Sequence, residues 1–178
     1  MITARFESAA VEHRLKRIAE RGGNLARPLN AIGEVLLTSI AKNFEDGGRY
    51  STPGSVRGGT NRWHPLAAST LLNRNRSYGI MNVSGTLARS FQKTISGNTL
   101  AIGTNRIQAA ILHGGGKTKP HVIRPRNGKA LAFNSIGGHI IARSVNHPGS
   151  DIPARPILVV QDEDVDESLH ILDRYLYA

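Results

Sequence analysis

VNHPGSDIPARPILVV, residues Val145–Val160, is the part of the chain that proline constrains most. The residue before each of its prolines is held extended, and Gly149 supplies a sharp turn. After the last proline, Ile157-Leu158-Val159-Val160 is an apolar run that can be buried. The stretch therefore predicts a stiff, kinked segment anchored in the core, which fixes the direction of everything after it. Its three prolines, each of which fixes φ and removes a backbone donor, are Pro148, Pro153 and Pro156.

Three longer helices are predicted from apolar residues that recur at spacings of three and four. Ser8 can cap the first helix, which runs to about Arg21, and Asn24 can cap the second, which runs to about Phe44. The third helix begins near Asp162, and the acids of its first turn complement the helix dipole. The apolar positions of this third helix are Val165, Leu169, Leu172 and Leu176.

Short strands and short helices are predicted between the longer helices. Alternation from Phe91 to Ile95 and from Leu100 to Ile102 predicts a hairpin with Gly97-Asn98 as its turn. Further strand-like pieces are Val122-Ile123, Ala130–Phe133 and His139–Val145. Short helices are expected at about Ala67–Asn73 and from a cap at Asn105 to Leu112. An N-terminal extended arm is expected from the alternation of Ile2, Ala4 and Phe6.

These elements predict one α+β domain over residues 1–178, with short antiparallel strands forming a sheet packed against about three helices. Its parts are an N-terminal arm and helix at 1–24, a long flexible loop at 47–62 and an acidic C-terminal helix at 161–178. The loop is rich in Gly, Ser, Thr and Pro and is about as long as functional loops become. Trp63, the only tryptophan, closes this loop and is expected to anchor it in the core rather than to bind a ligand.

The formal charge of +10 is distributed unevenly along the chain. Residues 1–46 carry seven Lys/Arg and six acids, whereas residues 47–150 carry fourteen Lys/Arg and no acid. Residues 151–178 carry two arginines and seven acids. Such asymmetry indicates either an external polyanion or a complementary partner, and the partner can be a second copy of the chain.

Composition limits the compartment and excludes several site types. The chain has no cysteine, so it has no disulfide, no thiolate nucleophile and no cysteine zinc site, which fits a reducing compartment. No run has the length of a transmembrane helix, and the N-terminus lacks the apolar core of a signal peptide. The sequence therefore predicts a soluble protein that is made in a cytoplasm.

The motifs that could carry chemistry are incomplete. Gly114–Thr118 (GGGKT) resembles the end of a phosphate-binding loop, but Ile111 stands where that motif needs glycine, and Pro120 blocks the helix that should follow. The seven histidines include no pair at i,i+4 spacing, and residues 47–150 offer no carboxylate to complete a metal site or to support hydrolysis. We therefore expect no enzyme activity, no catalytic residue, no metal and no cofactor.

Basic loop segments around Arg57–Arg62 and Arg74–Arg76 could contact phosphate. However, aromatic residues make up only 5% of the chain, which is too sparse for a stacking platform on single strands. No helix-turn-helix or zinc-finger signature is present. A solvated or subunit-facing basic surface is therefore favoured, and a small basic nucleic-acid-binding protein remains the alternative function.

Six short motifs follow one another between about residues 25 and 165. They are Arg62–Leu66 (RWHPL) with Ser69-Thr70, Ser84–Ser90 (SGTLARS), Ile102–Asn105 (IGTN), Ala109–Gly115 (AAILHGG), Ile123–Phe133 (IRPRNGKALAF) and Ser144–Leu158 (SVNHPGSDIPARPIL). In this order and spacing they resemble the phage virion morphogenesis family, the Mu-like tail-completion proteins. Residues 1–24 and 47–61 match no motif of that family.

The resemblance implies a structural virion protein of a tailed bacteriophage. Such proteins form rings, usually six-fold, in the neck between the connector or stopper and the tail tube, where they complete the tail or allow head joining. It implies a protein assembled in the host cytoplasm and located in the virion neck or tail, with no membrane partner and no catalysis.

The charge pattern adds candidate site residues to this expectation. Head-to-tail rings need two different, complementary faces on each subunit, and the acidic helix and the basic region provide opposite charges. Subunit-interface candidates are Asp162, Glu163, Asp164, Asp166, Glu167 and Arg155. Candidates for a loop that reaches a neighbouring ring, or the lumen through which DNA passes, are Arg49, Arg57 and Arg62.

Overall fold

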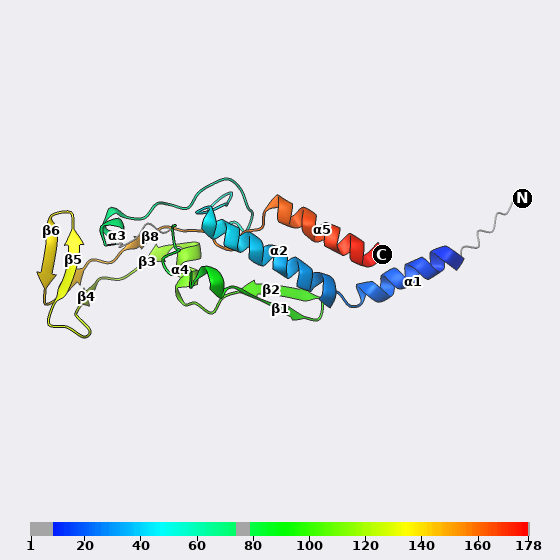
Figure 1. The fold of residues 1–178 in the computed structure, drawn as a ribbon, viewed down its shortest axis with the longest axis horizontal. Coiled ribbons are helices and arrows are strands. Elements are labelled where there is room, and N and C mark those ends of the chain that lie inside the picture. The colour runs from blue at the N-terminus through cyan, green and yellow to red at the C-terminus, as the bar shows by residue number, and fades with distance from the viewer. Residues whose placement is uncertain (1–8, 74–78, 178) are drawn as a thin grey trace, which may run out of the picture. The chain divides into compact units, whose positions relative to one another are not determined.

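The computed structural model describes residues 9–73 and 79–177. Helices and antiparallel strand pairs make an α+β fold, as the sequence predicts (Figure 1). By their contacts the residues form two units. Unit 1 comprises Met1–Ser39, Phe91–Gly103 and Gln161–Ala178, and unit 2 comprises Ile40–Ser90 and Thr104–Val160. The expected N-terminal arm, the Ser8 cap and the basic turn at 74–78 lie outside the described residues.

Unit 1 contains the three longer helices and one hairpin, and local signals form each of them. Asn24 Oδ1 accepts a hydrogen bond from the Ala26 amide at 3.2 Å, so the predicted cap of the second helix is confirmed. The predicted hairpin is also confirmed, with Ile95 opposite Leu100 and the two-residue turn Gly97-Asn98. The elements are α1 (Ala9–Gly22), α2 (Ala26–Glu45, which continues into unit 2), β1 (Gln92–Ser96), β2 (Thr99–Gly103) and α5 (Asp162–Tyr177).

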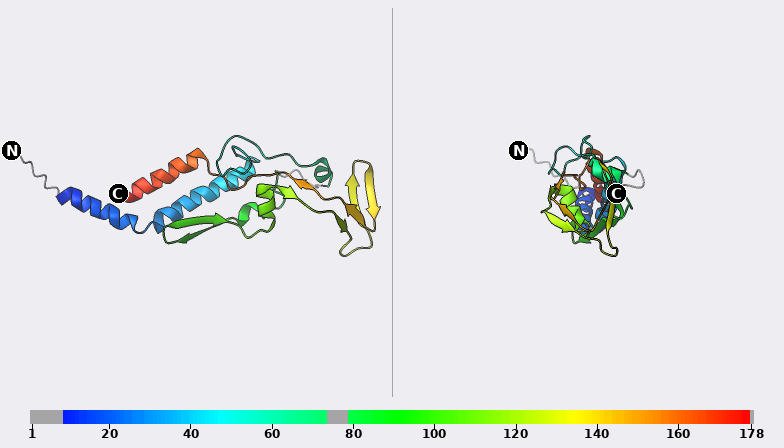
Figure 2. Two further views of the ribbon diagram at one scale, coloured as in Figure 1. Left: turned by 180° about the vertical axis from the view of Figure 1, so that it is seen from behind. Right: turned by 90° about the vertical axis from the view of Figure 1, so that its left-hand side faces the viewer.

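The hairpin and α5 lie on different sides of α2 in unit 1 (Figures 1 and 2). Gly33 lets the hairpin approach, because a Cβ at this position would come within 2.5 Å of Lys93 Cδ. The Lys93 ammonium donates to the Asn30 carbonyl at 2.7 Å and to the Glu34 carboxylate at 2.6 Å. On the other side, the buried Ser39 hydroxyl donates to the Asp164 carboxylate at 2.6 Å and so ties α2 to α5.

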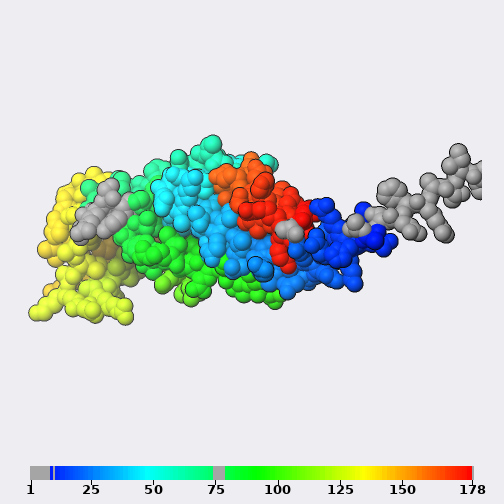
Figure 3. All heavy atoms as spheres, turned by 45° about the vertical axis from the view of Figure 1, so that its right-hand side comes forward, coloured from blue at the N-terminus to red at the C-terminus, as the bar shows by residue number. Residues whose placement is uncertain are grey.

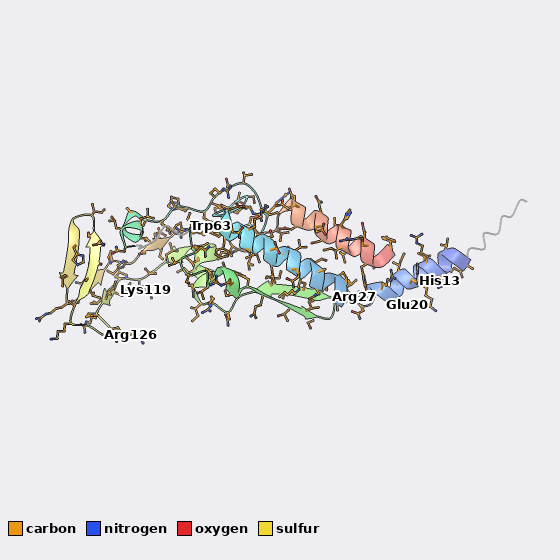
Figure 4. The ribbon with its side chains drawn as sticks, viewed as in Figure 1. His13, Glu20, Arg27, Trp63, Lys119 and Arg126 are labelled. Carbon is orange, nitrogen blue, oxygen red and sulfur yellow. The ribbon has the colours of Figure 1, made fainter. Side chains whose placement is uncertain are left out.

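The core of unit 2 forms around Trp63 and the apolar run after the proline segment. Ile157 and Val159 are 1% and 4% exposed, so the predicted burial is confirmed for these two residues, whereas Leu158 is half-buried and Val160 is 37% exposed. Trp63 is 2% exposed and meets Phe44 edge-on, with ring centroids 5.3 Å apart, which confirms its predicted role as an anchor (Figure 4). Asn43 fixes the run through a 2.8 Å hydrogen bond from Nδ2 to the Ile157 carbonyl.

The remaining strands of unit 2 do not form the single sheet that was expected. They are three nested antiparallel pairs, β3–β8, β4–β7 and β5–β6, which follow one another in Figure 1. We call this two-stranded element, residues 116–152, the β arm. Prolines between its strands, Pro120, Pro125 and Pro148, remove backbone donors and so interrupt the hydrogen-bonded ladder between successive pairs. Its strands are β3 (Gly116–Lys117), β4 (His121–Ile123), β5 (Leu131–Ser135), β6 (Gly138–Ala142), β7 (Val145–His147) and β8 (Asp151–Ile152).

Three short helical segments complete unit 2: α3 (Ala68–Leu72), the 3₁₀ helix η1 (Ala88–Ser90) and α4 (Gln108–Gly114). The prediction that Asn105 caps α4 is wrong. The residue before α4 is Ile107, which has helical φ and ψ and makes no side-chain cap. The local turn is instead held by Thr104, whose hydroxyl accepts from the Arg106 amide at 3.2 Å.

The proline segment has the predicted extended and turn geometry. His147 and Ile152, which precede two of the prolines, lie in β7 and β8. Gly149 has a φ of +96°, and a Cβ there would also collide with the carbonyl oxygen of Thr118. The segment therefore closes the β arm and leads directly into the buried run at Ile157.

Candidate functional site

The acidic run at the start of α5 contains residues of two kinds. Asp164 is 5% exposed, and its carboxylate accepts from the Ser39 hydroxyl at 2.6 Å and from the Gln161 amide at 2.9 Å. The second bond satisfies an amide at the start of the helix, in the manner of a capping box. Asp164 was predicted as an interface residue, but the structure uses it inside unit 1 to hold α5 on α2. The acids of this run that remain exposed are Asp162, Glu163, Asp166 and Glu167.

Apolar residues of α5 are also exposed beside these acids. Val165 and Leu169 are 45% and 56% exposed, although their spacing is that of a core-facing stripe. Leu172 and Leu176, which continue the stripe, are half-buried. The outer surface of α5 is thus both apolar and acidic, and this combination is typical of a protein contact surface.

Arg155, a further predicted interface residue, is 6% exposed and lies in the core of unit 2. Its Nε donates to the His64 carbonyl at 3.0 Å and its Nη2 donates to the Pro65 carbonyl at 3.2 Å. Burial lowers the pKa of the guanidinium, because desolvation disfavours its charged form. Within unit 2, therefore, Arg155 joins the proline segment to the chain just after Trp63.

Replacing Arg155 by lysine is expected to lower the free energy of unfolding by about 1–2 kcal/mol. The planar guanidinium donates to two carbonyls at once, and the ammonium of lysine cannot reproduce both hydrogen bonds. The midpoint of urea unfolding, followed by circular dichroism, measures this loss. The control Arg57→Lys makes the same side-chain replacement at an exposed position. Its free energy of unfolding should stay within about 0.5 kcal/mol of that of the parent protein. Equal effects of the two substitutions would contradict the role given to Arg155.

The sequence interpretation missed the structural role of His113, because it considered the seven histidines only as possible metal ligands. His113 Nδ1 accepts from the amide of Ile157 at 3.0 Å. This bond requires the tautomer with hydrogen on Nε2. His113 is the last residue but one of a short helix, and this position gave no signal for a partner 44 residues away.

The predicted flexible loop at 47–62 is tied down by backbone hydrogen bonds within unit 2. Tyr50 pairs with Asn61 in both directions, and the Gly58 amide donates to the Val160 carbonyl at 2.7 Å. Arg49 lies 3.6 Å from the Asp46 carboxylate, and Arg62 donates to the Gly48 carbonyl at 3.2 Å. Both arginines therefore stabilise the C-terminal end of α2, and the third loop candidate, Arg57, is exposed.

The β arm carries most of the exposed Lys/Arg side chains that the structure describes in residues 47–150. It contains six Lys/Arg and one acid, Asp151, which lies 3.5 Å from Lys117. Lys119 and Arg126 are labelled in Figure 4. Apolar side chains are exposed here too, with Ile136 at 87% and Ile141 at 71%. An isolated two-stranded ribbon is only marginally stable in water, so this surface is suited to a partner.

Unit 1 contains a hollow of about 520 Å³ at the ends of α1 and α5. Arg21 donates to the Tyr175 carbonyl at 3.0 Å across it, and the Tyr175 hydroxyl donates to the Asn24 carbonyl at 2.7 Å. These bonds attach the end of α1 to the end of α5. The lining residues are Arg21, Arg27, Pro28, Ala31, Ile171, Arg174 and Tyr175.

Neither a metal cluster nor a membrane span is found in the described part of the chain. Residues 9–73 and 79–177 contain no group of three or more His, Asp or Glu side chains that could hold a metal ion. None of their helices is both long enough and apolar enough to cross a bilayer. The arrangement that stands out is therefore a set of charged and apolar surfaces.

Comparison with known proteins gives one match. Residues 6–177 match the model of the phage virion morphogenesis family. No curated protein and no solved structure matches the chain. The family match extends beyond the motifs recognised in the sequence and includes α1, α5 and the loop at 47–61. Because it covers nearly the whole chain, the resemblance is confirmed, and the chain belongs to the phage virion morphogenesis family.

Proposed function

We propose that this chain is a structural subunit of a tailed-phage neck or tail, which forms a ring and completes the tail or joins it to the head. The family match over residues 6–177 is the observation that carries the proposal. The exposed charged and apolar surfaces support it, because a subunit that works by assembly needs partner surfaces. Its place would be the virion, after assembly in the host cytoplasm, and it would act without catalysis and without a cofactor.

The ring requires head-to-tail contacts in which one face of a subunit meets a different face of the next. The exposed acids of α5 provide a negative face, and residues 47–150 provide the opposite charge, above all through the β arm. We propose that α5 of one copy lies against this basic surface of its neighbour in a hexameric ring. Other neck and tail proteins, namely the connector or stopper and the tail tube, would contact the ring above and below.

Neutralising the four exposed acids of α5 tests this arrangement. The variant carries Asp162→Asn, Glu163→Gln, Asp166→Asn and Glu167→Gln and retains the buried Asp164. We expect the ring to disappear in size-exclusion chromatography with mass measurement, both for the protein alone and for the protein mixed with tails that lack it. The control variant, Glu45→Gln, removes an exposed acid outside α5 and the β arm and should assemble normally. Unchanged rings in the four-acid variant would refute the charge pairing.

The second candidate function is nucleic-acid binding, and the specific observation in its favour is the positive charge of the β arm. In a ring, the arm or Arg57 could also face DNA in the lumen. If the isolated monomer binds DNA, the logarithm of its affinity should fall steeply with the logarithm of the salt concentration. Tight, salt-dependent binding by the monomer, together with failure to associate with tails, would favour this alternative. Replacing Arg49, Arg57 and Arg62 should reduce DNA retention in virions only if the loop faces the lumen.

A further inference from the structure

We infer that helix α1 of one copy packs along the exposed apolar stripe of α5 in a neighbouring copy. The inference rests on the ring proposed above and adds a second, apolar contact to the charged one. The inference gives α1 a role in assembly, whereas the sequence motifs assigned no role to this helix. Its elements are two amphipathic helices with opposite flanking charge, and both lie in unit 1.

The apolar face of α1 is largely exposed in the part of unit 1 that the structure describes. Val11 and Leu15 are 52% and 60% exposed, and Ile18, which continues the stripe at i+7, is half-buried. A helix of 14 residues is marginal in water by itself and normally depends on burial of one face. One flank of this stripe carries Arg14 and Arg17, which have no salt-bridge partner in the described part of the chain.

The apolar stripe of α5 has the opposite flank. Val165 and Leu169 are exposed, and helical geometry places Asp166 and Asp173 along one border of the stripe. Both aspartates are exposed, and neither has an ion-pair partner among residues 9–73 and 79–177. Each copy thus offers a basic apolar helix and an acidic apolar helix, which are complementary in both respects.

The two stripes do not cover each other within one chain. The contact between α1 and α5 is at their C-terminal ends, where Arg21 bonds to the Tyr175 carbonyl. From there α1 runs on past the end of α5 instead of alongside it, as Figures 1 to 3 show. His13, labelled in Figure 4, lies in the part of α1 that stands apart. A helix held this way is placed to reach a second copy, and the contact repeats from copy to copy because it is head-to-tail.

Disulfide cross-linking tests the contact directly, since the chain has no native cysteine. Leu15 lies near the middle of the α1 stripe and Leu169 near the middle of the α5 stripe. The pair Leu15→Cys with Leu169→Cys can therefore bridge the two helices whether they pack parallel or antiparallel. After mild oxidation of assembled protein, we expect a ladder of linked chains on non-reducing gels. The matched control pairs Leu15→Cys with Ile136→Cys, at the exposed turn of the β arm, and should give no ladder. A ladder from the control pair alone, or a link only within one chain, overturns the inference.

Charge reversal provides an independent readout. Arg14→Glu with Arg17→Glu should weaken self-association at least about tenfold in sedimentation experiments, and so should Asp166→Lys with Asp173→Lys. The chain that carries all four changes should recover most of the loss. If both charge-reversed variants form rings as the parent protein does, this contact is overturned and the proposed function still stands. A parent protein that stays monomeric alone and with tails would overturn the proposed function as well.

Discussion

Replacing Trp63 by alanine is expected to lower the free energy of unfolding of unit 2 by about 3–5 kcal/mol. The side chain is 2% exposed, and its ring stands edge-on to Phe44 at 77°. Its indole N–H donates to the Pro156 carbonyl at 2.8 Å, so the same residue also fixes the proline segment. The substitution therefore removes a large buried ring and the shorter of two hydrogen bonds to the Pro156 carbonyl, which keeps only the bond from Asn43 Nδ2 at 3.3 Å.

Urea unfolding followed by circular dichroism measures this loss, because the alanine variant has no tryptophan fluorescence. Trp63→Phe is the matched variant: it keeps an aromatic ring against Phe44 and removes the N–H, so we expect a smaller loss of about 1–2 kcal/mol. Gly48→Ala should also destabilise, since a Cβ there would lie 2.5 Å from the Trp63 amide nitrogen, and its φ is +108°. A Trp63→Ala variant as stable as Trp63→Phe would contradict the role of the buried ring.

The parts of the fold that could be predicted from the sequence depend on neighbours along the chain. The cap at Asn24 and the turn at Gly97-Asn98 act over a few residues, and both are found where the pattern places them. The nesting of the β arm could not be predicted in this way. β3 and β8 have two residues each, and their pairing joins Gly116 to Ile152, far apart in the sequence. Strands this short carry no alternation from which a partner can be inferred.

The candidate site was predicted to a similar extent. The acids of α5 were predicted as interface residues because their sequence run is continuous, but the pattern did not show that one of them, Asp164, is buried. Its spacing of three residues after Gln161 is a capping signal, although glutamine is not among the preferred cap residues. The contacts of Arg155 could not be predicted for another reason. Its partners are carbonyls of His64 and Pro65, about 90 residues earlier in the chain, and no local pattern reports them.

Asp164→Ala is expected to lower the free energy of unfolding of unit 1 by about 2–4 kcal/mol, because two hydrogen bonds to a buried carboxylate are lost together. The Gln161 amide, which is buried in the structure, would be left without an acceptor at the start of α5. Asp166→Ala, two residues later and exposed, serves as the control and should change stability by no more than about 0.5 kcal/mol. Urea unfolding measures both variants.

A double-mutant cycle with Ser39→Ala separates the two bonds of Asp164. If the 2.6 Å bond from the Ser39 hydroxyl contributes to stability, the sum of the losses in the two single variants should exceed the loss in the double variant. The reason is that each single change already breaks this bond, so the double variant loses it only once. Additive losses would contradict the coupling between α2 and α5. The result also matters for the assembly experiments. A variant that neutralises Asp164 together with its exposed neighbours would loosen α5 from α2. It would therefore lose its rings even if charge pairing between copies were unimportant. Only variants that retain Asp164 can therefore distinguish a defect in folding from a defect in assembly.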